Sequence, residues 1–348
     1  MRITANQVTM ARIFLLPVPV YMLIYGETIQ WWIAFGIFVI LGATDFVDGW
    51  MARKEGPTRL GSLIDPVADK IFIAAIMLSM IAIGVFEPWI ISVLLTREFL
   101  MTALRSSVAY RQQVFKTSLL AKLKTIIQMG GLGTIFFTIS MPEKALSIVC
   151  GALAVPFLLL AIIYWSKSKK APFWAIPVFF AFVLVATLAH FVSKDTNVAV
   201  QMGIIITLTW VSAFDYLVGS FKMFQSSGMQ GGDWARMLWS IIFGVFVTPL
   251  VAYYPVMVLP LLVSISLEFG LGGIDNIVVG EKHIFSSWPF ILTSFAGLLF
   301  AAFINYSILV QPIFEPLYLA IALAGFSALV CGSLFGRHVD LFKRRSEK

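Results

Sequence analysis

The stretch "DFVDGWMARKEGPTRLGSLIDPVADK", residues 45–70, places four aspartates between two apolar runs. Both runs are long enough to cross a lipid bilayer as helices. An ionised carboxylate inside a bilayer costs at least a few kcal/mol, so an acidic residue in such a place usually has a function. The stretch therefore predicts two neighbouring membrane helices whose ends carry a functional group of acids.

The composition of the whole chain agrees with a membrane protein. Hydrophobic residues make up 59% of its 348 residues and charged residues 12%, and the mean hydropathy is +0.92. A soluble chain carries about 25% charged residues. We therefore predict an all-α, polytopic integral membrane helical bundle. The net charge of +7 is attributed to its loops, and no nucleic-acid partner is expected.

Apolar runs predict about twelve membrane spans, and the run at 255–270 is short enough to be re-entrant. The predicted spans are 10–26, 30–53, 62–85, 88–109, 123–140, 145–165, 172–193, 200–220, 236–253, 255–270, 287–306 and 316–336. Lys and Arg gather in alternate loops, including both termini and the aspartate stretch. By the positive-inside rule these segments face the cytoplasm. We expect the membrane to be a bacterial inner (cell) membrane.

The four aspartates can meet at one place. Asp45 and Asp48 are three residues apart and Asp65 and Asp69 are four apart, so each pair shares one helix face. A short loop makes the two helices antiparallel neighbours. Carboxylates without Cys or His favour Mg²⁺ or Mn²⁺, and a pair of such ions typically binds phosphate. The alternative is that these acids form ion pairs with Arg53, Arg59 and Lys70.

The pattern Asp45-x2-Asp48-Gly49-x2-Ala52-Arg53, followed by Gly61-x3-Asp65-x3-Asp69, resembles the signature of the CDP-alcohol phosphotransferase family. One spacing differs, because residues 54–60 separate Arg53 from Gly61 where the family pattern has one residue more. The resemblance implies transfer of a phosphatidyl group from CDP-diacylglycerol to an alcohol, with release of CMP, by a homodimer. The implied ligands of two Mg²⁺ or Mn²⁺ ions are Asp45, Asp48, Asp65 and Asp69.

The same resemblance assigns further roles. Asp69 is the implied general base, and the implied CDP-binding residues are Asp48, Gly49, Ala52, Arg53 and Gly61. Four stretches, at 6–18, 96–106, 121–129 and 212–217, resemble members of this family that transfer to glycerol 3-phosphate. A dianionic acceptor needs a basic pocket, and the candidates for binding its phosphate are Arg97, Arg105, Lys122 and Lys124.

Several alternatives stay open at this point. Lys122 and Lys124 could anchor a helix at the membrane surface, and Arg97 could pair with Glu98 to hold helices together. The acceptor could instead be serine, an inositol phosphate or phosphatidylglycerol. A different class of function is an ion-coupled transporter, which would carry its acids near the bilayer midplane on broken helices.

The rest of the chain carries no recognised motif. The polar stretch at 225–233 predicts a linker between two domains. The first, residues 1–224, would be the phosphotransferase domain, with an inserted helical hairpin at about 145–193. The second, residues 234–348, would be a membrane domain of unassigned role. Glu268 is expected at the end of a span, with its carboxylate reaching the membrane surface. The glycines of "GLGGIDNIVVGEKH" (270–283) have neither the spacing of a P-loop nor the G-x-G-x-x-G spacing of a dinucleotide-binding site.

Overall fold

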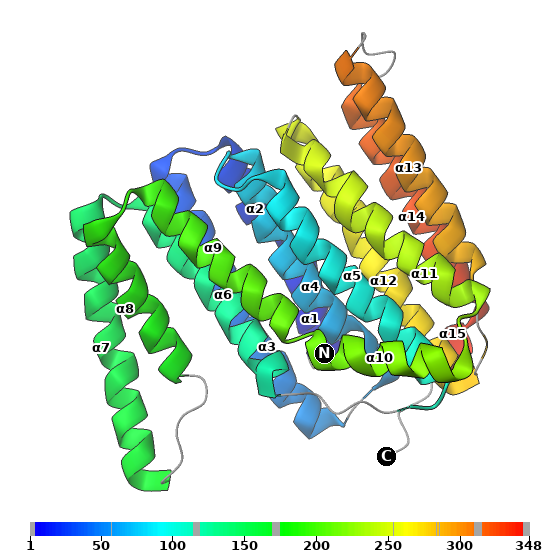
Figure 1. Ribbon diagram of the computed structural model, residues 1–348, viewed down its shortest axis with the longest axis horizontal. Coiled ribbons are helices and arrows are strands. Elements are labelled where there is room, and N and C mark those ends of the chain that lie inside the picture. The colour runs from blue at the N-terminus through cyan, green and yellow to red at the C-terminus, as the bar shows by residue number, and fades with distance from the viewer. Residues whose placement is uncertain are drawn as a thin grey trace. The chain divides into compact units, whose positions relative to one another are not determined.

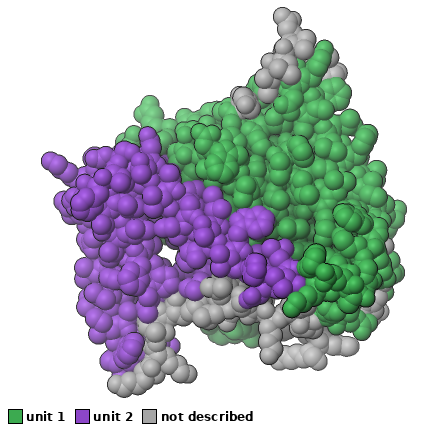
Figure 2. All heavy atoms as spheres, viewed as in Figure 1, with its two compact units in different colours: residues 1–114, 220–348 green, residues 115–219 purple. Residues whose placement is uncertain are grey.

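The structure is a computed structural model, which describes residues 4–56, 58–113, 119–168, 175–252, 254–282, 284, 286–309 and 315–343. These residues are almost entirely helical and contain no strand, which confirms the all-α prediction. They form two compact units, one of residues 1–114 and 220–348 and the other of residues 115–219 (Figure 2).

The first unit begins with the helices that bear the aspartates. α1 (Ala5–Leu15) and α2 (Pro17–Tyr25) are followed by α3 (Thr28–Glu55) and α4 (Arg59–Ala82). Gly56, with φ of +88°, ends α3, since a backbone in this region favours glycine. Thr58 then caps α4 by accepting a hydrogen bond of 2.9 Å from the Gly61 amide. The turn between the two helices is therefore short, as the sequence predicts, and α1 packs against both helices.

The remaining helices of the first unit come from both ends of the chain. α5 (Pro88–Tyr110) is followed, after the second unit, by α11 (Gly231–Ile241) and the irregular helical turns η1 (Ile242–Val247), η2 (Thr248–Ala252) and η3 (Pro255–Met257). α12 (Val258–Lys282), α13 (Trp288–Leu309), α14 (Pro316–Arg337) and α15 (Val339–Lys343) complete it. α12 packs directly against α4, α5 and α14 (Figure 1).

The second unit is a bundle of four helices, α6 (Leu119–Ser140), α7 (Glu143–Ser168), α8 (Ala175–Phe191) and α9 (Lys194–Val211). α7 and α8 lie side by side (Figure 1) and share a small buried cluster around Cys150 and Val185. Gln201 on α9 bonds to Thr134 and Thr138 on α6 at 2.8 and 2.9 Å. α10 (Phe214–Ser227) leads from this unit back into the first.

The positions of the predicted membrane spans agree well with the helices. Nine helical segments of the described residues are long and apolar enough to cross a membrane. α4 and α5 are equally long but carry charged residues in their interiors, and α8 is shorter. The chain is therefore a polytopic helical membrane protein.

Three expectations need correction or qualification. The run at 255–270 is not a short re-entrant segment, because α12 continues for 25 residues with Pro260 in its first turn, where proline is tolerated. Glu268 is wholly buried, and its carboxylate accepts hydrogen bonds from Trp239 and Ser327 inside the first unit. The polar stretch at 225–233 is mostly helical, since only residues 228–230 separate α10 from α11. The predicted division into two domains there remains a prediction.

Candidate active site

The four aspartates converge on two side chains of α1. The Arg12 guanidinium lies 3.1 Å from Asp45, 3.6 Å from Asp48 and 3.4 Å from Asp69. The Thr9 hydroxyl lies 2.8 Å from Asp48 and 3.3 Å from Asp65. Three helices thus bring their polar residues to one place, as the spacing of the aspartates predicts.

The charges in this cluster are unbalanced. Arg12 is only 2% exposed and Asp48 only 4%, whereas the side chains of Asp45 and Asp69 are 43% and 38% exposed. When all four carboxylates are ionised, one arginine offsets one of four negative charges. Like charges held this close together are stabilised by further cations. The excess negative charge of the cluster therefore favours the binding of a positively charged ligand.

The four acids of the cluster suit hard divalent cations, since their ligand atoms are carboxylate oxygens. Among the residues that the structure describes, no group of three or more His, Cys, Asp or Glu side chains is arranged to hold a metal ion directly. The Arg12 guanidinium instead contacts three of the carboxylates. The chemistry of the site therefore fits a metal, and an ion coordinated by these acids would take over contacts that Arg12 makes here.

The other predicted binding residues lie around the cluster. Gly49 and Ala52 are half-buried on α3, and Arg53 is exposed near its end. A β-carbon at Gly49 would meet only the Arg53 guanidinium, at 3.7 Å, so this face of α3 is open to a ligand. Gly61 lies at the start of α4, and a β-carbon there would lie 2.9 Å from the Asn6 side chain. Its lack of a side chain allows α1 to approach α4 closely.

The alternative pairing of the aspartates receives little support. Arg59 forms its ion pair with Glu281 of α12, at 3.3 Å. Lys70 donates a hydrogen bond to Thr102 of α5. The residue that forms ion pairs with the aspartates is Arg12, which the sequence pattern does not single out. An arginine within the predicted first membrane helix was the available signal, because an intramembrane charge usually faces a polar partner.

The predicted phosphate-binding residues are placed only in part. Arg97 and Glu98 are both buried and form an ion pair of 3.1 Å within α5, so this pair by itself joins no two helices. Arg105 is exposed and lines a pocket together with Lys70. Lys122 and Lys124 belong to the second unit, and the Lys122 side chain lies outside the described part of the chain. The structure thus places Arg105 and Lys70 in the lining of one pocket, and the predicted set of four remains a prediction.

This fold and this cluster define a class: a polytopic membrane protein with a carboxylate site at adjoining helix ends. Comparison with known proteins specifies it further. A sequence profile of the CDP-alcohol phosphatidyltransferase family matches residues 2–160. A probable phosphatidylglycerophosphate synthase of Mycobacterium tuberculosis is 33% identical over 155 residues, which cover 43% of this chain and 74% of the relative. No solved structure matches the chain significantly.

Two further relatives carry the name CDP-diacylglycerol–glycerol-3-phosphate 3-phosphatidyltransferase. That of Bacillus subtilis is 32% identical over 139 residues, covering 36% of this chain and 71% of the relative. That of Rickettsia typhi is 33% identical over 128 residues, covering 36% and 72%. The chain belongs to the CDP-alcohol phosphatidyltransferase family, as its signature predicts, and is therefore a transferase. The matched region ends within α7, so it includes part of the predicted insert and excludes α11–α14.

Proposed function

We propose that the chain transfers a phosphatidyl group from CDP-diacylglycerol to sn-glycerol 3-phosphate, giving phosphatidylglycerophosphate and CMP in phospholipid synthesis. The observation that carries the proposal is the convergence of Asp45, Asp48, Asp65 and Asp69 around Arg12 and Thr9. The choice of acceptor is supported by the names of the relatives.

The proposed reaction is a displacement at phosphorus. The acceptor oxygen forms a new bond to the phosphorus of the phosphatidyl group, the bond from that phosphorus to CMP breaks, and CMP leaves with the bonding electrons. Asp69 takes the proton of the attacking hydroxyl. Its partial exposure supports this role, because a general base must be reached by the substrate. Asp48 and Arg53, with Gly49, Ala52 and Gly61, would hold the CDP group.

Members of this family generally use divalent metal ions. Two Mg²⁺ or Mn²⁺ ions held by Asp45, Asp48, Asp65 and Asp69 would neutralise the charge that develops on the diphosphate. Arg12 would keep the carboxylates close together before such ions bind. Thr9, which donates to Asp48 and contacts Asp65, would orient these two oxygens.

We also propose where the acceptor binds and how the chain is oriented. Arg97, Arg105, Lys122 and Lys124 would bind the phosphate of the acceptor, and the exposed Arg105 is the one whose position best supports this. Both termini and the active site would face the cytoplasm, as the distribution of Lys and Arg indicates, and the membrane would be a bacterial inner membrane. The working form would be a homodimer, as the family resemblance implies.

The test is CMP release by the purified full chain with CDP-diacylglycerol and Mg²⁺ or Mn²⁺. We expect release with glycerol 3-phosphate and none with serine, inositol phosphate or phosphatidylglycerol. Asp69→Asn should abolish release while leaving the amount of folded protein unchanged. The matched control is Asp195→Asn, at an exposed site in the first turn of α9, which should remain active. Release with another acceptor, or an active Asp69→Asn variant, would overturn the corresponding part of the proposal.

A further inference from the structure

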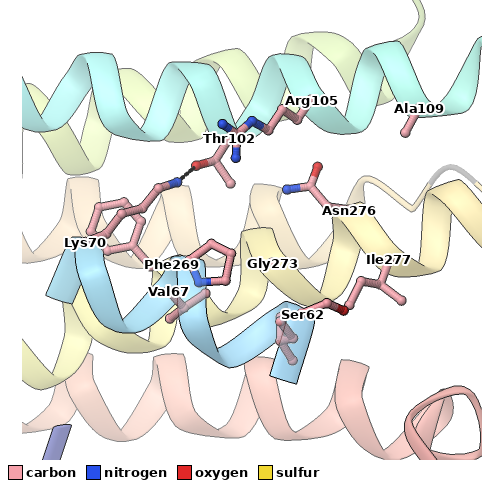
Figure 3. A pocket seen from close by; sticks show the side chains of 12 residues that line it. Ser62, Val67, Lys70, Thr102, Arg105, Ala109, Phe269, Gly273, Asn276 and Ile277 are labelled. Carbon is pink, nitrogen blue, oxygen red and sulfur yellow. Dashed lines mark hydrogen bonds between the residues drawn. The ribbon is translucent and has the colours of Figure 1, made fainter. Parts of the chain in front are cut away.

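A pocket of about 240 Å³ lies between α4, α5 and α12 (Figure 3). Lys70 comes from α4, Thr102 and Arg105 come from α5, and Asn276 comes from α12. Figure 3 shows Lys70 and Asn276 pointing toward α5. The volume is below the range of roughly 300–1,000 Å³ that drug-sized ligands occupy, so the pocket suits a small group.

The charges of the lining residues indicate the charge of the group that the pocket would bind. The twelve residues that line the pocket include two cations, Lys70 and Arg105, and none of these residues is acidic. Arg105 makes no hydrogen bond or ion pair with any residue that the structure describes, and it is exposed. Two cations and no acid in a small, partly apolar site favour an anion with several acceptor oxygens.

The three acids of α12 nearest in sequence to its pocket residues bond to residues outside the pocket lining. Glu268 accepts hydrogen bonds of 2.6 Å from Trp239 and from Ser327. Asp275 is bound to the guanidinium of Arg236, with an Nε to Oδ2 distance of 2.8 Å. Glu281 forms its ion pair with Arg59. None of these three carboxylates forms an ion pair with Arg105 in the described part of the chain.

Asn276 adds a polar donor to the pocket. Its Oδ1 accepts a hydrogen bond of 2.7 Å from the Ser106 hydroxyl. This bond fixes the amide between α12 and α5 and leaves the Nδ2 hydrogens as donors for a ligand. A neutral amide donor beside two cations can add a hydrogen bond to a phosphate oxygen.

We propose that this pocket binds a phosphate group, and that α12 supplies one of its walls through Phe269, Gly273 and Asn276. α12 lies outside the region that matches the family, so the C-terminal part of the chain takes part in ligand binding. The phosphate belongs either to the soluble acceptor or to the headgroup of an anionic lipid. In the first case the inference rests on the proposed function, because it adds Lys70 and Asn276 to Arg105 at the acceptor site.

A glycine makes this wall possible. A β-carbon at Gly273 would lie 2.6 Å from Leu63 and 3.0 Å from Val67 of α4. The absence of a side chain lets α12 approach α4 closely enough to bring Asn276 beside Ser106 and Arg105. Gly273, in the glycine-rich sequence at 270–273, thus allows the close packing of α12 against α4. Other residues of α12 line the pocket.

The experiment measures binding and does not depend on turnover. The full chain is purified into nanodiscs of phosphatidylcholine, and the affinity for inorganic phosphate and for sn-glycerol 3-phosphate is measured by calorimetry. We expect Lys70→Gln and Asn276→Asp to weaken binding by at least tenfold, and Lys70→Arg to retain it. The matched controls, Lys282→Gln at the end of α12 and Asn305→Asp on α13, should bind as the unaltered chain does. Thermal unfolding of each variant shows that it is folded.

A second set of nanodiscs, containing phosphatidylglycerol, separates the two sources of phosphate. If the ligand is a lipid headgroup, the anionic lipid should raise the unfolding temperature of the unaltered chain, and Asn276→Asp should remove that increase. Equal affinities of the pocket variants and controls for every probe would overturn the inference even in an active enzyme. Phosphate binding that depends on Lys70 and Asn276 in a chain without transferase activity would uphold the pocket and reject the proposed function.

Discussion

Arg12 places one positive charge among four carboxylates, and it contacts Asp45, Asp48 and Asp69 within 3.6 Å. When no metal is bound, removal of the Arg12 guanidinium leaves four partly buried carboxylates that repel one another. We expect Arg12→Gln to destabilise the metal-free chain by about 3–5 kcal/mol. Because the competing guanidinium is gone, Mg²⁺ should then bind more tightly and give a larger rise in unfolding temperature.

The measurement is thermal unfolding of the detergent-solubilised chain over a series of Mg²⁺ concentrations. Arg12→Lys, which keeps the charge but loses the forked donor, should lie between the unaltered chain and Arg12→Gln. A weaker response of Arg12→Gln to Mg²⁺ would show that Arg12 assists the metal rather than occupying its place.

The carboxylate site shows which residues a sequence pattern can reveal. The spacing of Asp45, Asp48, Asp65 and Asp69 determines which helix faces they share, so their convergence could be predicted. Thr9 and Arg12 belong to a third helix, and nothing in the spacing of α1 shows which residues of α3 and α4 it contacts. Their role depends on which helices pack together, and the spacing of residues along one helix does not show this.

Helix α12 depends on small residues where it meets α4. Alanine at Gly273 would bring its β-carbon within 2.6 Å of Leu63, whereas alanine at Gly270 would meet Cys331 at an ordinary 3.6 Å. We therefore expect Gly273→Ala to cost about 1–3 kcal/mol through overpacking, and Gly270→Ala to be neutral or stabilising, since alanine favours a helix. Unfolding of the two variants in denaturant tests this difference. Equal stabilities would show that α4 and α12 can move apart freely.

The helices of the chain were easier to predict than their ends and their irregular turns. Long apolar runs predict helices strongly, and the structure has helices at all the predicted positions. The π-helical turn η1 could not be foreseen. It lies against α5, where a β-carbon at Gly244 would collide with the Thr96 backbone, so its shape follows from contact with a distant segment.

The first unit contains a buried ion pair between helices of the C-terminal part. Arg236 is wholly buried and bound to Asp275, and it also donates to the Gly232 carbonyl at 2.9 Å. Asp275→Asn should destabilise the chain by about 3–5 kcal/mol, because it leaves the buried guanidinium without its counter-charge. The double variant Arg236→Met, Asp275→Leu should recover most of the loss. Unfolding in denaturant measures both, and a double variant as unstable as Asp275→Asn would contradict this explanation.

The C-terminal helices are also expected to be necessary for the transferase. α11 and α12 pack against α5, and α12 also packs against α4, so a chain that ends at residue 230 exposes these faces. We expect this truncated chain to aggregate in detergent and to lack CMP release. The check is size-exclusion chromatography with the release assay. A monodisperse, active truncated chain would show that the family region folds independently.

The arrangement of the compact units could not be predicted from the sequence. A polar stretch at 225–233 indicates a boundary, but contacts between α5 and α11 join segments on either side of it. Arg111 at the end of α5 binds Asp233 of α11 at 2.7 and 3.2 Å. Both residues are polar and stand near helix ends, where sequence alone gives them no particular partner.

The first unit is interrupted by the second, and this order has a consequence for biosynthesis. α5 ends at Tyr110 and α12 begins at Val258, so well over a hundred residues are translated between two helices that pack together. At roughly 5–20 residues per second, this takes on the order of 7–30 s. During that interval α4 and α5 lack the helix that covers them, so lipid or the insertion machinery must shield their charged residues until α12 emerges from the ribosome.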